Sequence, residues 1–154
     1  MEPELSEFTD GNIEFKYPSV FKEKSSPTRE IISGSSDWQD LGTLSLNDQI
    51  LIEIVKAKKE TTPIEARDVT EESRKALTHS ELLSHTTIKN SHNILAYSSI
   101  HSVMDPRTRE MITYNIFFFK AKGKVYALTV LGYDYDFEII ELTADIIFET
   151  LQRR

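Results

Sequence analysis

Four histidines are the residues best suited to hold a metal ion: His79, His85, His92 and His101. A neutral imidazole is a common ligand for zinc and related metals. His85 and His101 fall in two expected strands joined by the loop at residues 90–93. If this loop pairs Lys89 with Ile94, the two histidines project from opposite faces, whereas a slip of one residue would reunite them. We therefore predict scattered histidines and no metal site.

An acidic run provides the second candidate for metal binding and consists of Asp134, Asp136, Glu138 and Glu141. Calcium prefers carboxylate oxygens, but the run lacks the glycine and the spacing of an EF-hand loop. Carboxylates are also favoured at the N-terminus of a helix, where the helix dipole is positive. We interpret the run as the start of a helix.

Six lysines form a candidate binding surface: Lys56, Lys58 and Lys59 end one expected strand, and Lys120, Lys122 and Lys124 flank a hairpin tip. If these two ends meet in space, they form a basic patch that can hold an anionic ligand or partner. The simpler interpretation is that solvated lysines protect strand ends from edge pairing. Together with Trp38, which we expect to anchor a neighbouring loop, these lysines are the candidate partner-binding residues.

Five tyrosines could line a pocket: Tyr97, Tyr114, Tyr126, Tyr133 and Tyr135. The alternative role is packing within strands, which is the usual one for aromatic residues. The chain has no Gly-rich phosphate loop, serine nucleophile elbow or histidine-base motif. It has no cysteine, which excludes disulfides and thiolate chemistry. The sequence therefore predicts no catalytic residue and no cofactor.

Length and charge limit the functional classes. The 154 residues suffice for one domain with its own core. The net charge of −7 disfavours binding of nucleic acid or of an anionic membrane over the whole surface. The start has neither the basic nor the apolar region of a signal peptide, and no apolar run approaches bilayer length. We expect an extracytoplasmic or surface-tethered location if a leader precedes Met1, and a cytoplasmic one if Met1 is the natural start.

The elements that must position these candidates centre on residues 94–131, where three runs have strand character: 94–103, 110–120 and 124–131. The middle run contains Ile116, Phe117, Phe118 and Phe119 in succession, which places large apolar side chains on both faces of one strand. Such a strand requires a covering layer on each side. The turns at residues 105–108 and 121–123 favour antiparallel neighbours, with Gly123 in the left-handed conformation.

Two helices are predicted as the covers. The first spans about 62–78 and begins with a capping box, Thr62-Pro63-Ile64-Glu65. Its thin apolar stripe consists of Ile64, Ala66, Val69, Ala76 and Leu77. The second spans about 134–152 with Asp134 as its N-cap, and its stripe consists of Phe137, Ile140, Ala144, Ile147, Phe148 and Leu151.

Further strands are expected at 13–17, around Ile31 and Ile32, at 50–55 and at 82–89, and residues 1–11 are expected to form a flexible N-terminal segment. In the strand at 50–55, we place Ile50, Ile52 and Ile54 on one face. The predicted fold class is α+β: a three-layer α/β/α sandwich with a mainly antiparallel sheet of about six strands and a long C-terminal helix. Residues 12–154 would form this single domain.

The chain resembles the PsbP-like family in the order of its elements and in several short motifs. These are IEFKYPSVFKE (13–23), TIKNSHNILAYSSI (87–100) and FFFKAKGKVYALTV (117–130), followed by an amphipathic closing helix. Two departures are Phe21, where relatives usually have Trp, and residues 90–93, where they have an Asn-Gly turn. The resemblance implies the α/β/α sandwich shared by the photosystem II subunit PsbP and a Ran-binding nuclear factor. It also implies a noncatalytic scaffold.

Two functional hypotheses follow. The first is a noncatalytic PsbP-like binding module that docks an unidentified protein partner through the loops of residues 22–40 and the hairpin tips, with no nucleic acid and no membrane insertion. The second is a small-molecule-binding or enzymatic α/β domain with a pocket between the sheet and the 62–78 helix. We favour the first.

Overall fold

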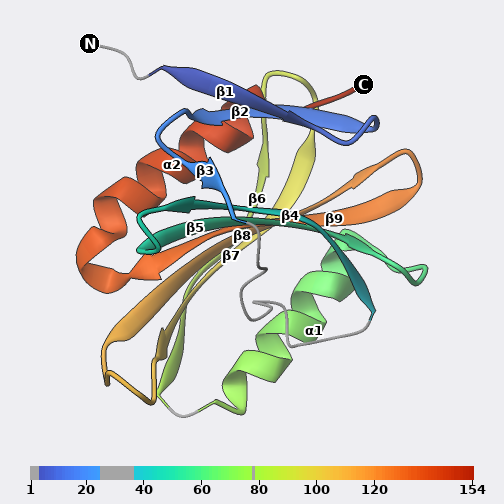
Figure 1. Cartoon of the computed structure of the whole chain (residues 1–154). Coiled ribbons are helices and arrows are strands. Elements are labelled where there is room, and N and C mark those ends of the chain that lie inside the picture. The colour runs from blue at the N-terminus through green and yellow to red at the C-terminus, as the bar shows by residue number, and fades with distance from the viewer. Residues whose placement is uncertain (1–3, 25–36, 78) are drawn as a thin grey trace.

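The protein is a three-layer sandwich in which an antiparallel sheet lies between two helices (Figure 1). The structure is a computed structural model that describes residues 4–24, 37–77 and 79–154. The main sheet has seven strands, where we predicted about six. In spatial order they are β3 (Lys22–Glu23), β4 (Trp38–Leu46), β5 (Ile50–Ala57), β9 (Lys124–Tyr133), β8 (Met111–Ala121), β7 (Leu95–Met104) and β6 (Ser80–Lys89). The α+β sandwich is thus confirmed.

A small second sheet joins the two ends of the chain. It consists of β1 (Leu5–Thr9), β2 (Ile13–Pro18) and β10 (Gln152–Arg153), all antiparallel. Residues 5–9, which we expected in a flexible segment, instead pair along β2. The strand predicted at 31–32 lies outside the described residues. Trp38, which we expected in a loop, begins β4.

The centre of the main sheet is buried on both faces by the alternation of β8. Phe117 and Phe119 belong to the core on the side of α2 (Phe137–Thr150), and Ile116 and Phe118 belong to the core on the side of α1 (Pro63–Lys75). This confirms the prediction that one strand is covered by two separate layers. Neither of these helices has the length and apolarity required to span a bilayer.

The α2 layer is held by apolar contact, as its sequence pattern predicted. Its buried face carries Ile140, Ala144, Ile147 and Phe148, and the Phe148 ring stacks on Phe117 at a centroid distance of 5.1 Å. The helix starts later than predicted, after a 3₁₀ turn at Asp134–Asp136. Asp134 is therefore not the N-cap, and its carboxylate instead accepts a hydrogen bond from the Thr113 hydroxyl at 2.7 Å.

The hairpin between β8 and β9 is tighter than predicted. Ala121 pairs with Lys124, so the turn contains only Lys122 and Gly123. Both have positive φ, 54° and 77°, as a type I′ turn requires. The left-handed conformation predicted for Gly123 is present. The loop between β7 and β8 spans six residues, and the Asp105 side chain organises it by accepting from the Arg107 N–H at 2.9 Å.

The cap of α1 is correctly predicted, but its buried face is not. The Thr62 hydroxyl accepts from the Glu65 N–H at 3.1 Å, and Pro63 is the first helical residue. The buried residues are Ala66, Arg67, Thr70 and Arg74. Of the predicted stripe, Ile64, Val69 and Leu77 are exposed large apolar side chains. The predicted orientation of this stripe is wrong because the sheet face below α1 itself carries many polar groups.

We expect Ile147→Ala to lower the free energy of unfolding by about 3 kcal/mol, because the fully buried side chain leaves a cavity between α2 and the sheet. Leu142→Ala, in the same helix but 60% exposed, is the control and should change it by less than about 0.5 kcal/mol. Chemical denaturation measures both. Equal effects would contradict the assigned packing face.

Candidate functional site: a buried polar network under the first helix

The sheet face beneath α1 contains the polar and charged groups best suited to chemistry. Its buried members include Glu53 on β5, Thr129 on β9, and Ser99 and His101 on β7. The apolar part of this face is a smaller cluster around Ile116 and Phe118, packed against Ala66 of α1. Polar contacts therefore hold the helix beside this apolar cluster.

The pairing of β6 with β7 brings two of the four histidines to this face. Lys89 pairs with Leu95 and not with Ile94, and His85 pairs with Ser99. Paired residues project from the same face of a sheet, and residues two apart on one strand share a face. His85, Ser99 and His101 consequently lie together, which makes the expected separation of the two histidines wrong.

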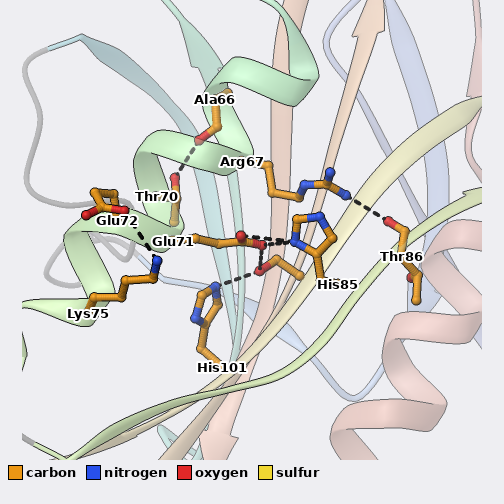
Figure 2. A network of polar contacts seen from close by, with 10 residues as sticks. Ala66, Arg67, Thr70, Glu71, Glu72, Lys75, His85, Thr86 and His101 are labelled. Carbon is orange, nitrogen blue, oxygen red and sulfur yellow. Dashed lines mark hydrogen bonds and ion pairs between the residues drawn. The ribbon is translucent and has the colours of Figure 1, made fainter.

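Glu71 of α1 is the centre of the network (Figure 2). Its carboxylate accepts from Nδ1 of His85 at 2.8 and 3.0 Å and from the Ser99 hydroxyl at 2.9 Å. The Ser99 oxygen is in turn 2.6 Å from Nε2 of His101. These contacts form a continuous hydrogen-bonded chain from the partly exposed His85 to the buried His101.

The direction of the hydrogen bonds follows from the available protons. A carboxylate only accepts, so both His85 and Ser99 donate to Glu71. The single hydroxyl proton of Ser99 is thereby used, and Nε2–H of His101 must donate to the Ser99 oxygen. His101 therefore cannot act as the base for Ser99 through this nitrogen. Because Ser99 is fully buried, the arrangement does not present a nucleophile to substrate.

Two arginines of α1 extend the network along the same face. The Arg67 guanidinium donates to the Thr86 carbonyl at 3.0 Å and lies 5.4 Å from the Tyr97 ring centre. The Arg74 guanidinium lies 4.2 Å from the Tyr114 ring centre, close enough for a cation–π contact. Burial raises the pKa of the Tyr114 phenol, and Arg74 opposes this effect.

The pKa of His101 is strongly lowered. Burial and then the positive charge of Arg74 lower its pKa to about 4, while Glu71 acts in the opposite direction. The ring is therefore neutral at neutral pH. A neutral imidazole has a single N–H, and in His101 this is the Nε2–H that donates to Ser99. Protonation would place a second cation beside Arg74 beneath the helix.

The other metal candidates do not converge. His79 and His92 are exposed in the turns just before β6 and between β6 and β7. Within residues 4–24, 37–77 and 79–154, no three His, Asp or Glu side chains are arranged to hold a metal ion. Asp134 bonds to Thr113, and Glu138 lies in the first turn of α2, where its charge is favourable.

The candidate lysines reach one end of the main sheet, but from both faces. Lys56 pairs with Tyr126, and Lys124 lies two residues before Tyr126 on β9, so both project toward the α2 face. Lys120 pairs with Val125 and projects toward the α1 face. Lys58 and Lys122 are exposed in the adjoining loops and Lys59 forms an ion pair with Asp37 at 2.9 Å.

Trp38 connects this end of the sheet to α1. It pairs with Ala57, and its ring lies 6.5 Å from that of Phe118. A pocket of about 200 Å³ opens between Trp38 and the first turns of α1, with Ala57, Thr61 and Val69 among the lining residues. This is the place where the sequence predicted a gap. Of the loop expected to dock a partner, residues 25–36 lie outside the described part.

The five tyrosines do not line a common pocket. Tyr97 and Tyr114 lie under the arginines of α1, whereas Tyr126 is buried on the α2 face and donates to Asp10 at 2.8 Å. Tyr133 and Tyr135 stack on each other near the start of α2. Packing is thus the role that their positions indicate.

The sequence analysis missed the residues that complete the network, namely Glu71, Arg67, Arg74 and Ser99. A signal for them was present: in the helix at 63–75, Arg67, Glu71 and Arg74 recur at intervals of four and three, which places them on one side. We interpreted charged residues as solvent-facing, which is the usual outcome.

Comparison with known proteins identifies the fold. No family model and no curated protein sequence matches the chain. Among solved structures, cyanobacterial PsbP (CyanoP) from Synechocystis sp. PCC 6803 is similar over 100% of this chain and 95% of its own, with a TM-score of 0.62 and 9% identity. LpqN, involved in cell envelope biogenesis of Mycobacterium tuberculosis, matches over 77% of this chain and 79% of its own, with a TM-score of 0.53 and 14% identity.

A third similar structure is PA94 from Pseudomonas aeruginosa, described as a putative regulator of unknown function. It covers 92% of this chain and 91% of its own, with a TM-score of 0.52 and 12% identity. The chain therefore has the PsbP-like fold, as the sequence motifs suggested. At these identities the comparison extends to the fold alone.

We expect Glu71→Ala to lower the free energy of unfolding by about 2–3 kcal/mol, because the substitution leaves His85 and the buried Ser99 hydroxyl without their acceptor. The neighbouring Glu72→Ala is the matched control. Its side chain is 77% exposed and pairs only with Lys75 at the surface, so a change below about 0.5 kcal/mol is expected. Urea denaturation at neutral pH tests the pair.

Stability should fall in acid through His101. Its folded pKa of about 4 lies below the unfolded value of 6.5, so the unfolded chain binds the proton first as the pH falls. The contribution is complete above pH 6.5 and is lost toward pH 4, amounting to about 3 kcal/mol.

The measurement is the free energy of unfolding of wild type and His101→Gln between pH 7 and pH 4. The variant should lose less stability over this range, and His92→Gln, at an exposed site, should follow the wild type. Identical pH profiles for wild type and His101→Gln would contradict a neutral buried imidazole.

Proposed function

We propose that this protein is a noncatalytic binding module that docks an acidic segment of a protein partner at the lysine-bearing end of its sheet. The observation that carries the proposal is the convergence of the β5 and β9 ends, which brings Lys56 and Lys124 into neighbouring positions on the α2 face, with Trp38 on the opposite face of the same sheet end. On a chain with a net charge of −7, this end gathers six lysines, with Asp10 near Lys56 and Asp37 paired with Lys59 as neighbouring carboxylates.

The character of the surface supports docking over chemistry. Five of the six lysines are exposed, and Lys59 is the one that forms an ion pair in the described part of the chain. Trp38 adds an aromatic side chain of the type enriched at protein interfaces. The groups with chemical potential, Ser99 and His101, are instead buried and hydrogen-bonded to each other.

The pocket beside Trp38 supports a second candidate, the binding of a small molecule between the sheet and α1. Its walls combine apolar groups with Thr61 and Lys59. Its volume of about 200 Å³ is smaller than the roughly 300–1,000 Å³ of typical ligand pockets. For this reason docking of a protein segment is the better-supported function.

A charge-reversal experiment tests the docking proposal. The probe is a fluorescein-labelled oligo-glutamate peptide, titrated by anisotropy at low ionic strength against the full chain. The triple variant Lys120→Glu/Lys122→Glu/Lys124→Glu should weaken binding by at least about tenfold, because repulsion replaces attraction at the hairpin. The fluorescence of Trp38, the only tryptophan, gives a second readout at this end of the sheet.

The control is Lys16→Glu/Lys22→Glu/Lys89→Glu, which changes the net charge equally at exposed positions elsewhere. It should retain most of the affinity. Equal weakening by both triple variants would show that the peptide senses total charge only, and the proposed docking surface would be wrong.

A further inference from the structure

The outer side of α2 and of the 3₁₀ turn before it carries an exposed apolar stripe. It consists of Tyr135, which lies in that turn and stacks on Tyr133, and of Ile139, Leu142 and Ile146 in α2, spaced by four, three and four residues. Tyr135 and Leu142 are 67% and 60% exposed, Ile139 is 45% exposed, and Ile146 is half-buried. The spacing of Ile139, Leu142 and Ile146 aligns them along one line of α2, on the side opposite Ile140 and Ala144, which face the sheet. The helix is thus apolar on two sides.

An acidic row borders the stripe and consists of Glu138, Glu141, Asp145 and Glu149. Residues 137–150 contain no Lys, Arg or His, and none of the four carboxylates forms an ion pair with the residues that the structure describes. Their spacing by three and four residues places like charges next to one another, which destabilises a helix.

The end of α2 adds to this electrostatic cost. Glu149 lies in the last turn, where the helix dipole is negative and a carboxylate is unfavourable. Burial, and then repulsion from Glu149, raise the pKa of Asp145. A positively charged partner would offset the unfavourable position of Glu149 and the repulsion between Glu149 and Asp145. The free helix is thus weakened by charges that such a partner would compensate.

This combination excludes two other occupants of the stripe on physical grounds. A second copy packed α2 against α2 in a symmetric pair would bring the acidic rows into proximity. An anionic bilayer would repel the same carboxylates, since interfacial helices depend on Lys and Arg beside their apolar face. A partner must supply apolar and cationic groups together.

We propose that α2 is the docking surface for a basic amphipathic helix of another protein. From Tyr135 to Ile146 the stripe extends over 12 residues, about 16 Å, which suits contact with about three turns of a partner helix. Leucine-like side chains of the partner would cover Ile139 and Leu142, and its flanking Lys or Arg residues would pair with Glu141 and Asp145. This surface is separate from the lysine-bearing end and does not depend on the proposed function of that end.

The test uses a synthetic helical peptide of about 18 residues, with Leu at positions i, i+3, i+4 and i+7 and Lys elsewhere. Binding to the full chain is measured by calorimetry, and amide chemical shifts locate the contact. Wild type should bind with perturbed amides along residues 135–149. Ile139→Ser/Leu142→Ser should weaken binding by at least about tenfold, because both side chains are exposed and their loss removes the apolar contact.

A matched control is Ile64→Ser/Val69→Ser on α1, whose side chains are exposed to similar extents, 45% and 58%. It should bind as wild type does. A second variant, Glu141→Gln/Asp145→Asn, leaves the apolar stripe intact and should weaken binding by about three- to tenfold, with a smaller dependence on salt. This variant keeps the test valid if the serine variant proves unstable.

The proposal is overturned by any of three results: no binding of the peptide, equal binding of a scrambled peptide of the same composition, or equal weakening by the α1 control. Sedimentation of the protein alone provides a fourth. A dimer that Leu142→Ser dissociates would identify a second copy as the occupant instead.

Discussion

The alternation of side chains on β8 is the constraint on which the rest of the structure depends. Because Phe117 and Phe119 project to one face and Ile116 and Phe118 to the other, the strand is stable only if both faces are covered. The two covers meet this requirement by different physics. The α2 layer buries apolar area, which is non-directional, whereas the α1 layer also depends on hydrogen bonds of defined geometry.

The apolar half of the fold was therefore predictable from the sequence, and the polar half was not. Ile140, Ala144 and Ile147 follow the helical period and lie where that period places them. On α1, the same reasoning assigned Ile64 and Val69 to the inside, and both are exposed. Hydrophobic periodicity cannot identify a buried face made of charges, because the partners that make burial of a charge tolerable lie on distant strands.

The prediction that His85 and His101 lie on opposite faces was wrong for a related reason, because it depended on a difference of one residue in the strand register. Pairing Lys89 with Leu95 in place of Ile94 moves His85 to the α1 face, and a bulge between Leu82 and Ser84 is a further irregularity in the same pair of strands. No local pattern in β6 specifies this register, because its residues are mostly exposed. The contact of His85 with Glu71 adds a specific interaction that favours the observed pairing.

The two exposed surfaces of interest have opposite charge and lie apart in the fold. The hairpin tip of β8 and β9 lies on the right of Figure 1, and the start of α2 lies on the left. Head-to-tail association of opposite patches on one molecule would generate open filaments, because it does not close. The lysines, however, project from both faces of the sheet end and include no apolar stripe that could cover Ile139 and Leu142. Charge alone between exposed groups contributes little at physiological ionic strength, so self-recognition would lack the apolar contact that stabilises an interface. The separation of charge therefore favours two different partners over a second copy of the chain.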